Sequence, residues 1–388
     1  MDTPKSWINF IMCTVLKEFV LDSIAVLGAG NGGCSAAADL TLRGFHVRLY
    51  DFDSKRLKPI WDNKNEIELE GTPKEGSAKI SKVTADIGEA IKDVNLIIVI
   101  FPASAHKIFA EKLAFYLKDD QAIVLNPGST GGALCFAETL KKLGVRKRIP
   151  ICETNTLTYV CRLIGPARAK VFHISKQILF GSFPSVSIDD PYESFKELYP
   201  SIVRVDTVLE SSLLNPNAIM HPPATILNAG WIENTKGNFY FYYEGSTQAI
   251  AKVIEKVEEE RTNLAKVLGI KTTGFIEYFF KAGYTSERAM KMGSMYYALR
   301  DSEINQQIRA PDRLRHRYIE EDIKFGLVPF SSLGREYGAA TPTMDSLIHL
   351  ASIINQADYW NEGATLGGMG ISGLSLEGLH RFLHEGNK

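Results

Sequence analysis

The sequence predicts two domains of different class: an N-terminal α/β domain built on a doubly wound parallel sheet, followed by an all-helical C-terminal domain. Three observations support this prediction. Apolar strand patterns alternate with helical patterns from Ser23 onward, the strand patterns are apolar on both faces, and after about Asp206 only helical periodicity remains. Strands that are apolar on both faces are typical of a parallel sheet covered by helices on each side.

The first domain begins with a strand, a helix and a second strand, which together form a βαβ unit. The strand SIAVLG is followed by a small-residue helix that runs to about Arg43 and then by the strand HVRLYD. The alternation continues with the strands NLIIVIFP, QAIVLNPG and RIPICET, separated by the helices SAHKIFAEKLAFYL and GGALCFAETLKKLG. A series of this kind predicts a doubly wound parallel sheet.

The second domain is predicted from a helical repeat, most clearly in QAIAKVIEKVEEERTNLAKVLGI, where Gly269 is placed to end the helix. One face of that helix carries Ile250, Val253, Ile254, Val257, Leu264, Val267 and Leu268. We therefore expect an N-terminal extension over 1–22, the α/β domain over 23–206 and the helical domain over 207–388. Since no linker rich in Pro or Ser separates the two domains, we expect them to pack together with the functional site in their cleft.

The composition is that of an ordinary globular protein and excludes several classes. Of 388 residues, 45% are hydrophobic and 23% are charged, and 44 Lys and Arg against 45 Asp and Glu leave a net charge of -1. This balance lacks the basic excess that binding to a nucleic-acid backbone requires, so we expect no nucleic-acid partner. Five scattered cysteines without a CxxC spacing predict a reducing compartment, which we take to be the cytoplasm, and no metal site.

The apolar run WINFIMCTVL near the N-terminus is similar to the hydrophobic region of a secretory signal, but we do not expect it to act as one. Asp2 offsets Lys5, KEF follows in place of a small-residue cleavage site, and the run of ten residues is too short to cross a bilayer. We expect either a short appended helix or a natural start nearer Met12, and no membrane partner.

The stretch LGAGNGG contains the pattern G-x-G-x-x-G at Gly28, Gly30 and Gly33, with Asn31 inside it. In this pattern the glycines form a tight turn and let the backbone approach a pyrophosphate at a helix N-terminus. A lone match is weak evidence, but this one follows a predicted strand, opens a predicted helix and is followed 21 residues after Gly30 by Asp51. That context predicts a Rossmann domain whose motif residues bind a dinucleotide.

Asp51 favours NAD as the cofactor, because a carboxylate at the end of the second strand accepts hydrogen bonds from the adenosine ribose hydroxyls and repels a 2′-phosphate. Lys55 and Arg56 leave NADP open, since a nearby cation accommodates that phosphate. The same two residues also fit a solvated helix start.

A nicotinamide carries out hydride transfer, so the protein has to place the acceptor, neutralise its charge and move a proton. His221, in NPNAIMHPPATILNAG, is the candidate proton carrier, because imidazole changes its protonation near neutral pH. Arg317 and Asp322 lie five residues apart in HRYIEEDIKFGLVP. An arginine binds a carboxylate with two parallel hydrogen bonds, and an aspartate behind a histidine fixes its tautomer. From spacing alone, a buried structural histidine and a solvated ion-pair network remain the alternatives.

The combination of GAGNGG, NPGSTGGAL, NPNAIMHP and RYIEEDIKFGLVP closely resembles the opine dehydrogenases, the octopine/nopaline dehydrogenase family, and is most similar to the bacterial carboxyethyl-norvaline dehydrogenase type. The resemblance extends from about Ser23 to near the C-terminus and includes ATPTMDSLIHLAS and GISGLSLEGL. It implies a Rossmann domain followed by a helical domain. It also implies NAD(P)H-dependent reductive condensation of an α-keto acid, usually pyruvate, with the amino group of an L-amino acid.

The resemblance also implies roles for individual residues. In the family the histidine of the N-x-N-x-x-x-H-P motif is the catalytic acid/base, which corresponds to His221. The R-Y-x-x-E-D motif implies that Asp322 is its partner and that Arg317 binds the keto-acid carboxylate. The Glu-Thr and Cys-Arg segment that lies near the substrates in the family matches Glu153, Thr154, Cys161 and Arg162.

Several features keep more than one interpretation. NPGSTGG (126–132) either brings backbone amides to the nicotinamide or forms a plain strand-to-helix turn, and NFYFYYEG (238–245) either lines the amino-acid pocket or packs between helices. The two prolines after His221 are expected to shape a helix start or a kink. Two other functions remain: a dehydrogenase acting on one 2-keto or 3-hydroxy acid, and a non-catalytic protein that senses NAD(H). We expect a monomer or a homodimer.

Overall fold

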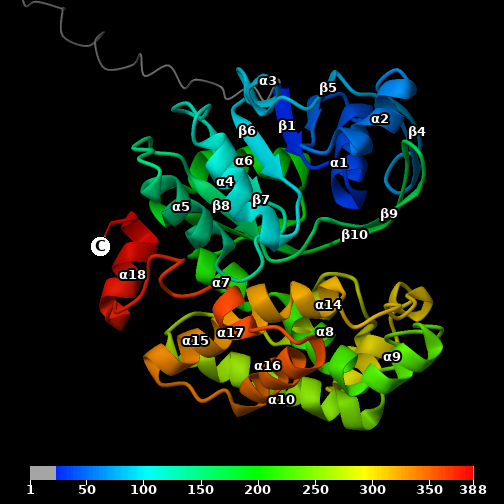
Figure 1. Ribbon diagram of the computed structural model, residues 1–388, viewed down its shortest axis with the longest axis vertical. Helices are drawn as coiled ribbons and strands as arrows, with labels where there is room; N and C mark the ends of the chain where they lie inside the picture. The colour runs from blue at the N-terminus through cyan, green and yellow to red at the C-terminus, as the bar shows by residue number, and fades with distance from the viewer. Residues whose placement is uncertain (1–22, 388) are drawn as a thin grey trace, which may run out of the picture.

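The computed structural model describes residues 23–387. The predicted N-terminal extension 1–22, with its run WINFIMCTVL and Cys13, lies outside the described residues. Figure 1 shows two lobes, one containing a central sheet and the other built of helices, and in chain order the sheet comes first. The predicted fold class, an α/β domain followed by an all-helical domain, is confirmed.

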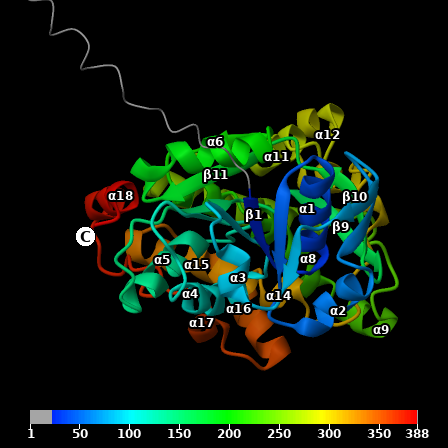
Figure 2. The same cartoon turned by 90° about the horizontal axis from the view of Figure 1, so that it is seen from above.

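The central sheet has eight strands, seen from above in Figure 2. In spatial order they are β12 (Ile202–Arg204), β11 (Ile178–Phe183), β8 (Ile151–Thr154), β7 (Ala122–Leu125), β6 (Leu96–Val99), β1 (Ser23–Leu27), β2 (His46–Tyr50) and β5 (Lys82–Thr84). Every neighbouring pair is parallel except β11 and β8. The sheet is therefore doubly wound as predicted, with one antiparallel step that the strand patterns did not predict.

Helices cover both faces of this sheet. They are α1 (Asn31–Leu42), α2 (Ser54–Asp62), α3 (Ile87–Ile91), α4 (His106–Leu113), α5 (Gly132–Lys142) and α6 (Asp189–Leu198). Successive residues of one strand enter different cores: Ile24 and Val26 pack with α1, α2 and α6, whereas Ala25 and Leu27 pack with α3, α4 and α5. This alternation explains why the strand patterns are apolar on both faces.

A second, smaller sheet packs against α1 and was not predicted. It has four strands in the spatial order β4 (Gly76–Lys79), β3 (Glu66–Gly71), β10 (Arg168–Ile174) and β9 (Tyr159–Gly165). Its strands come from two distant parts of the sequence, because β3 and β4 follow α2 whereas β9 and β10 follow β8. Through this sheet, residues far along the chain reach the N-terminal end of α1.

The second lobe is helical as predicted. Its helices are α7 (Val208–Leu213), α8 (Pro216–Leu227), α9 (Ala229–Thr235), α10 (Gln248–Val267), α11 (Phe275–Lys281), α12 (Glu287–Met292), α13 (Met295–Arg300), α14 (Arg317–Glu320), α15 (Val328–Tyr337), α16 (Pro342–Asn355) and α17 (Tyr359–Glu362). A π-helical turn, η4 (Ile323–Leu327), connects α14 to α15. The long predicted helix is α10, and Gly269 takes a left-handed φ of +65° just after it ends, as expected.

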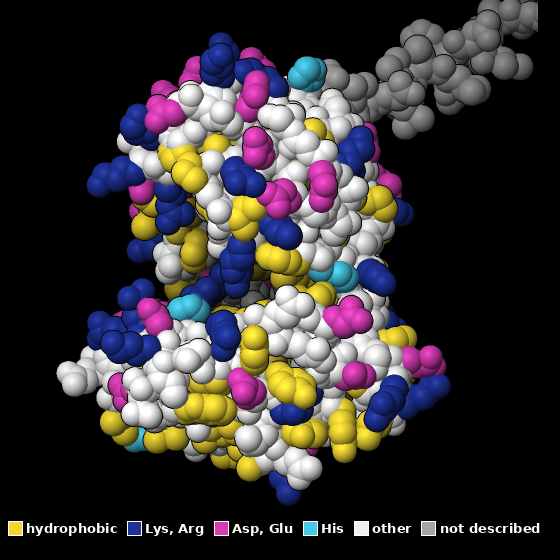
Figure 3. Space-filling view, turned by 90° about the vertical axis from the view of Figure 1, so that its right-hand side faces the viewer, with side chains coloured by type: hydrophobic (Ala, Val, Ile, Leu, Met, Phe, Trp, Pro, Cys, Tyr) yellow, Lys and Arg dark blue, Asp and Glu magenta, His cyan; other side chains and the backbone are white. Residues whose placement is uncertain are grey.

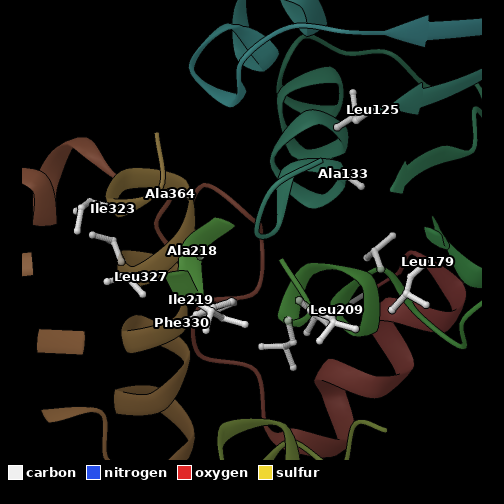
Figure 4. Packing of buried hydrophobic residues seen from close by; sticks show 14 of the residues in the cluster. Leu125, Ala133, Leu179, Leu209, Ala218, Ile219, Ile323, Leu327, Phe330 and Ala364 are labelled. Carbon is white, nitrogen blue, oxygen red and sulfur yellow. The ribbon is translucent and has the colours of Figure 1, made fainter. Parts of the chain in front are cut away.

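The two lobes share one continuous apolar core, part of which appears in Figure 4. The cluster runs from Leu125 and Ala133 in the first lobe through Leu209 on α7 to Ala218 and Phe330 in the second. The chain also returns at its C-terminal end, where α18 (Leu376–Glu385) packs against the first lobe. There the rings of Phe382 and Phe183 lie 4.9 Å apart. None of the described helices is long and apolar enough to cross a membrane.

Candidate active site

The turn between β1 and α1 fits the pyrophosphate of a dinucleotide. Gly28 takes a φ of +122°, and a Cβ on Gly33 would lie 1.6 Å from the Gly28 carbonyl oxygen, so both positions need glycine. Gly30, the residue before α1, makes no side-chain cap to the first turn of the helix. The first N–H groups of α1 are therefore left for a phosphate, which is the usual way in which this turn binds one.

Two predicted cofactor residues hold this turn in place. The carboxylate of Asp51 is fully buried, and its two oxygens accept hydrogen bonds from the main-chain N–H groups of Ala29 at 2.8 Å and Asp53 at 2.9 Å. The side-chain oxygen of Asn31 accepts one from the Leu163 N–H at 2.9 Å, which joins β9 to the start of α1. In this structure Asp51 anchors the turn, and its contact with the ribose stays a prediction.

Arg56 lies directly over the same turn. A Cβ on Gly30 would lie 3.4 Å from the Arg56 Nη1 atom. The guanidinium remains about half exposed, with Asp53 Oδ2 3.9 Å from its Nε. A cation in this position fits a phosphate group of the cofactor, and a contact of Arg56 with that group stays a prediction.

His221 and Asp322 form a buried hydrogen-bonded pair. His221 lies on α8 and Asp322 immediately precedes η4, and their Nδ1 and Oδ2 atoms are 2.7 Å apart although 101 positions separate them in the sequence. Only 5% of His221 and 4% of Asp322 are exposed, so bulk water does not weaken the pair. The structure thus brings together the two residues that were predicted to act as a dyad.

The packing of η4 against α8 positions this pair. A Cβ on Gly326 would lie 2.6 Å from the Cβ of Ala218, so only glycine lets the π-helical turn approach α8 this closely. The turn itself is closed by a bond from the Leu327 N–H to the Asp322 carbonyl at 3.0 Å. Single π-helical turns are often found at functional sites.

Of the two effects predicted for the prolines after His221, the helix start is wrong, and the kink stays a prediction. Helix α8 begins at Pro216, where the Asn215 side chain accepts a bond from the Asn217 N–H, and Pro222 and Pro223 lie in its interior. Interior prolines remove two helical N–H donors directly after the histidine. The carbonyls that lose a helical partner in this way are those of Ala218 and Ile219, whereas the His221 carbonyl accepts a bond from the Thr225 hydroxyl at 2.7 Å.

Two tyrosines that the sequence interpretation did not select contact the imidazole. The Tyr242 hydroxyl lies 2.7 Å from His221 Nε2. The Tyr318 ring stacks on the imidazole with centroids 3.8 Å apart and an angle of 22° between the planes. Tyr242 belongs to the aromatic stretch 238–245, whose composition was the available signal, and Tyr318 directly follows Arg317.

Arg317 lies at the edge of the His221–Asp322 pair, and it forms an ion pair with Glu321. Its side chain is 55% exposed, and its Nη2 is 3.1 Å from Glu321 Oε2. The other Glu321 oxygen accepts a bond from the Ala103 N–H at 3.0 Å, so this carboxylate joins the two lobes. Burial raises the pKa of Glu321, and the charge of Arg317 opposes that rise.

Arg162 and Cys161 bring β9 to the same place from the other lobe. Burial raises the pKa of Tyr318, and the charges of Arg162 and Arg317 both oppose this rise, which places the two guanidinium groups near one phenol. Cys161 is buried, and burial raises the pKa of its thiol while the same two arginines oppose the rise. The charges of Arg162 on β9 and Arg317 on α14 therefore both act on Tyr318 and Cys161, from opposite lobes.

Glu153 and Thr154 are not brought to the dyad. Glu153 is fully buried, and its carboxylate accepts bonds from the Ala133 N–H at 2.8 Å and from the hydroxyls of Ser211 at 3.1 Å and Ser212 at 2.5 Å. Burial raises the pKa of Glu153 to about 7. Thr154 is also buried and donates to the Thr156 carbonyl at 2.9 Å. In this structure Glu153 ties α5 to α7, and a substrate contact by either residue stays a prediction.

The loop 126–132 uses its amides for contacts within the protein. The N–H of Thr130 donates to the Phe325 carbonyl at 2.9 Å, and that of Gly131 donates to the Ser212 hydroxyl at 3.0 Å. These bonds favour the interpretation of a structural turn that joins the lobes. Within the described range 23–387, no group of three or more His, Cys, Asp or Glu residues could hold a metal ion.

Figure 3 shows the face where the two lobes are separated by a hollow with Lys and Arg side chains at its edges. The nucleotide turn belongs to the first lobe, and the His221–Asp322 pair belongs to the second. Such an arrangement combines a nucleotide cradle, an acid/base pair and cations for carboxylates. The fold and the site therefore define a two-domain NAD(P)-dependent oxidoreductase.

Comparisons with known proteins identify the family. Residues 204–355 match the NAD/NADP octopine/nopaline dehydrogenase alpha-helical domain, and residues 23–169 match the NAD-dependent glycerol-3-phosphate dehydrogenase N-terminus. An opine dehydrogenase of Arthrobacter sp. (strain 1C) is 37% identical over 355 residues, covering 92% of this chain and 97% of the relative. The vitopine synthase of Allorhizobium ampelinum is 24% identical over 374 residues, covering 92% and 97%. The chain belongs to the opine (octopine/nopaline) dehydrogenase family.

Solved structures agree on the fold. An octopine dehydrogenase with NADH and L-arginine superposes with a TM-score of 0.74 at 19% identity, covering 94% of this chain and 98% of that one. A yersinopine dehydrogenase with bound NADP+ gives a TM-score of 0.70 at 15% identity, covering 94% and 98%. A D-mandelate dehydrogenase gives 0.60 at 20% identity, covering 86% and 98%. Members of this fold thus occur with either nicotinamide cofactor.

Proposed function

We propose that this protein condenses an α-keto acid with the amino group of an L-amino acid and reduces the resulting imine, with pyruvate as the keto acid. The product of such a reaction is a secondary amine with two carboxylates. The observation that carries this proposal is the buried His221–Asp322 pair beside two convergent arginines, Arg162 and Arg317, in a chain of the opine dehydrogenase family. Two cations match two carboxylates, and one acid/base pair matches the protons that condensation has to move.

His221 is the proposed proton carrier. The Asp322 carboxylate only accepts hydrogen bonds, so it fixes the tautomer in which His221 Nδ1 carries the proton and Nε2 is basic. In that tautomer the imidazole is the final acceptor of a proton lost by the incoming ammonium group, which makes the amine nucleophilic. Asp322 then stabilises the imidazolium, and the proton is available when the hydroxyl of the carbinolamine leaves as water.

The two arginines are the proposed carboxylate sites. Arg317, whose side chain is 55% exposed and paired with Glu321, holds the keto-acid carboxylate. Arg162, on β9, holds the carboxylate of the amino acid. Because these residues belong to opposite lobes, the two substrates are placed between them with the reacting carbon and nitrogen side by side.

The cofactor would be held by the turn at Gly28, Gly30 and Gly33, with Arg56 over it. When bound, the reduced nicotinamide supplies the hydride that converts the imine to the secondary amine. The residues of this chain hold and orient the dinucleotide, and packing of the two lobes excludes water from the imine.

The test is an NADH-oxidation screen with pyruvate against all twenty amino acids, with each substrate omitted in turn. Oxidation only when keto acid and amino acid are both present supports the proposal. Oxidation with a keto acid alone would make the protein a dehydrogenase of a single keto or hydroxy acid. NADH binding without turnover of any pair, including with other keto acids, would make it a sensor of the cofactor.

We further propose that the protein works in the cytoplasm as a monomer or a homodimer. The four described cysteines are free thiols, which fits a reducing compartment. Sedimentation of the purified protein measures the oligomeric state, and a larger assembly would contradict this part of the proposal.

A further inference from the structure

Both ring nitrogens of His221 are already engaged. Nδ1 faces Asp322 at 2.7 Å and Nε2 faces the Tyr242 hydroxyl at 2.7 Å. Since a carboxylate cannot donate, Nδ1 carries the proton of the neutral ring, and Nε2 has to accept one from the Tyr242 hydroxyl. The outer end of this chain is therefore the Tyr242 hydroxyl oxygen, and no nitrogen of the histidine is left for a substrate.

Tyr242 is held rigidly in this position. The adjacent Phe241 is fully buried, and its N–H donates to the Ile308 carbonyl at 2.9 Å. Three residues after Tyr242, the Gly245 carbonyl accepts a bond from the Asn228 side chain at 3.0 Å. These bonds hold the backbone on both sides of Tyr242, and the Tyr242 side chain is itself buried, with 3% of the residue exposed.

The surroundings of Tyr242 keep its hydroxyl protonated. Burial raises the pKa of Tyr242 well above its ordinary range, and the charge of Arg162 opposes this rise. The charge on a deprotonated Tyr242 would in turn raise the pKa of Arg317. The Tyr242 hydroxyl thus lies near Arg162 and Arg317, the two proposed carboxylate sites. In the resting protein it donates its hydrogen bond to His221 Nε2. The ionisable groups that face it are His221 on α8, Arg162 on β9, and Arg317, Tyr318 and Asp322 on the segment from α14 to η4.

We infer that Tyr242 is the group through which His221 delivers its proton to the substrate, so that Asp322, His221 and Tyr242 form a three-membered proton relay. This inference rests on the proposed condensation and adds a residue to it. The pattern N-x-N-x-x-x-H-P supplies the imidazole, whereas the outer donor comes from the stretch 238–245.

The relay operates when the carbinolamine loses water. The nitrogen lone pair forms the C=N bond, the C–O bond breaks, and the leaving oxygen takes the Tyr242 proton and departs as water. At the same time the imidazolium of His221 gives its Nε2 proton to the Tyr242 oxygen and becomes neutral. The two transfers occur together, because the buried phenol does not form a free phenolate at neutral pH.

The experiment compares Tyr242→Phe with Tyr243→Phe, a control that removes the hydroxyl of the next residue, whose side chain is exposed. Both variants keep their rings. For Tyr242→Phe we expect kcat of the condensation to fall at least about 100-fold, the scale of a general acid, with the Kd for NADH within about twofold of wild type. For Tyr243→Phe we expect kcat close to that of the wild type, because His221 Nε2 faces the hydroxyl of Tyr242 and not that of Tyr243.

A proton inventory in mixtures of H2O and D2O separates the relay from a structural role. We expect a curved inventory for the wild type, since two protons move together, and a linear one for Tyr242→Phe. A linear inventory for the wild type overturns the relay even where Tyr242→Phe fails to fold. Turnover of Tyr242→Phe at or above the wild-type rate also overturns it. If the wild type itself turns over no pair of substrates, the proposed condensation fails instead.

Discussion

The nucleotide turn and the proton-transfer site differ in how their residues are distributed along the chain. The turn and Asp51, which anchors it, lie within a single βαβ unit. The other site joins His221 to Asp322 across 101 positions and adds Arg162 from the opposite lobe. When a site lies within one local unit, the spacing of its residues along the sequence can be recognised directly. When a site is assembled from distant segments by tertiary packing, its residues have no fixed local spacing to recognise.

The same difference predicts that the two regions fail independently. The nucleotide turn is closed by bonds within the first lobe, so changes in the second lobe should leave NADH binding intact. The His221–Asp322 pair depends on the contact between Gly326 and Ala218 and on the packing of the two lobes. It can therefore be lost while the nucleotide turn remains intact. The predictions below test this separation in order of decreasing effect.

The largest effect is expected for His221→Asn. Asparagine removes the transferable proton, so turnover should fall by roughly two to four orders of magnitude while the Kd for NADH stays unchanged. The matched control is His316→Asn, because His316 caps α14 through the Tyr318 N–H and asparagine also caps helices well. Steady-state kinetics and NADH fluorescence titration measure the two quantities, and a near-normal rate for His221→Asn would exclude it as the acid/base.

Glu153 ties α5 to α7, and we expect the stability that this contact provides to depend on pH. Its folded-state pKa is raised from 4.5 to about 7, so its contribution to stability is complete below about pH 4.5 and is lost as the pH rises through 7. Relative to Glu153→Gln, the unfolding free energy of the wild type should fall by about 3 kcal/mol between pH 4.5 and 8. Urea unfolding at several pH values measures it, with the exposed Glu193→Gln as control; parallel curves for wild type and Glu153→Gln would contradict the prediction.

Much of the fold could be predicted because each element carries its own pattern. The apolar strands of the main sheet, the glycine turn and α10 with Gly269 all agree with their sequence patterns. The small sheet could not be predicted, since strands such as GSAK at β4 are short and polar. Strand β4 pairs with β3, which in turn pairs with a strand 100 positions away, as in Glu68 with Arg168. Long-range pairing of this kind is set by tertiary structure and not by local propensity.

The candidate site divides in the same way. The nucleotide motif was recognised from spacing, while the dyad was selected only because the sequence resembles a family. Tyr242 was not selected at all, because a tyrosine in an aromatic stretch looks like ordinary core until its hydroxyl is seen 2.7 Å from His221. Glu153 is the opposite case. The family resemblance matched it to the segment near the substrates, but in the structure it is fully buried among hydroxyls and a main-chain N–H.

A smaller effect is expected for Arg317→Lys. Lysine keeps the charge but loses the two parallel bonds to a carboxylate, so the KM for the keto acid should rise about tenfold while kcat changes little. The control is Arg313→Lys, an exposed arginine beside Asp312 on the same segment, which should leave both constants unchanged. An unchanged KM in Arg317→Lys would remove Arg317 from the keto-acid site and leave Arg162 as the remaining candidate.

The smallest expected effect concerns cofactor choice within the nucleotide turn. A carboxylate that only reads the ribose would make Asp51→Ser shift the preference towards NADP, but the buried Asp51 carboxylate also holds the N–H groups of Ala29 and Asp53. We therefore expect Asp51→Ser to weaken NADH and NADPH together, because the turn itself loosens. Arg56→Ala should instead lower the ratio of kcat/KM for NADPH to kcat/KM for NADH. The decrease should be about tenfold at most, because the variant removes a charged donor that lies over the turn. The kcat/KM values for both cofactors measure this, and a larger shift in Asp51→Ser than in Arg56→Ala would show that Asp51 reads the ribose after all.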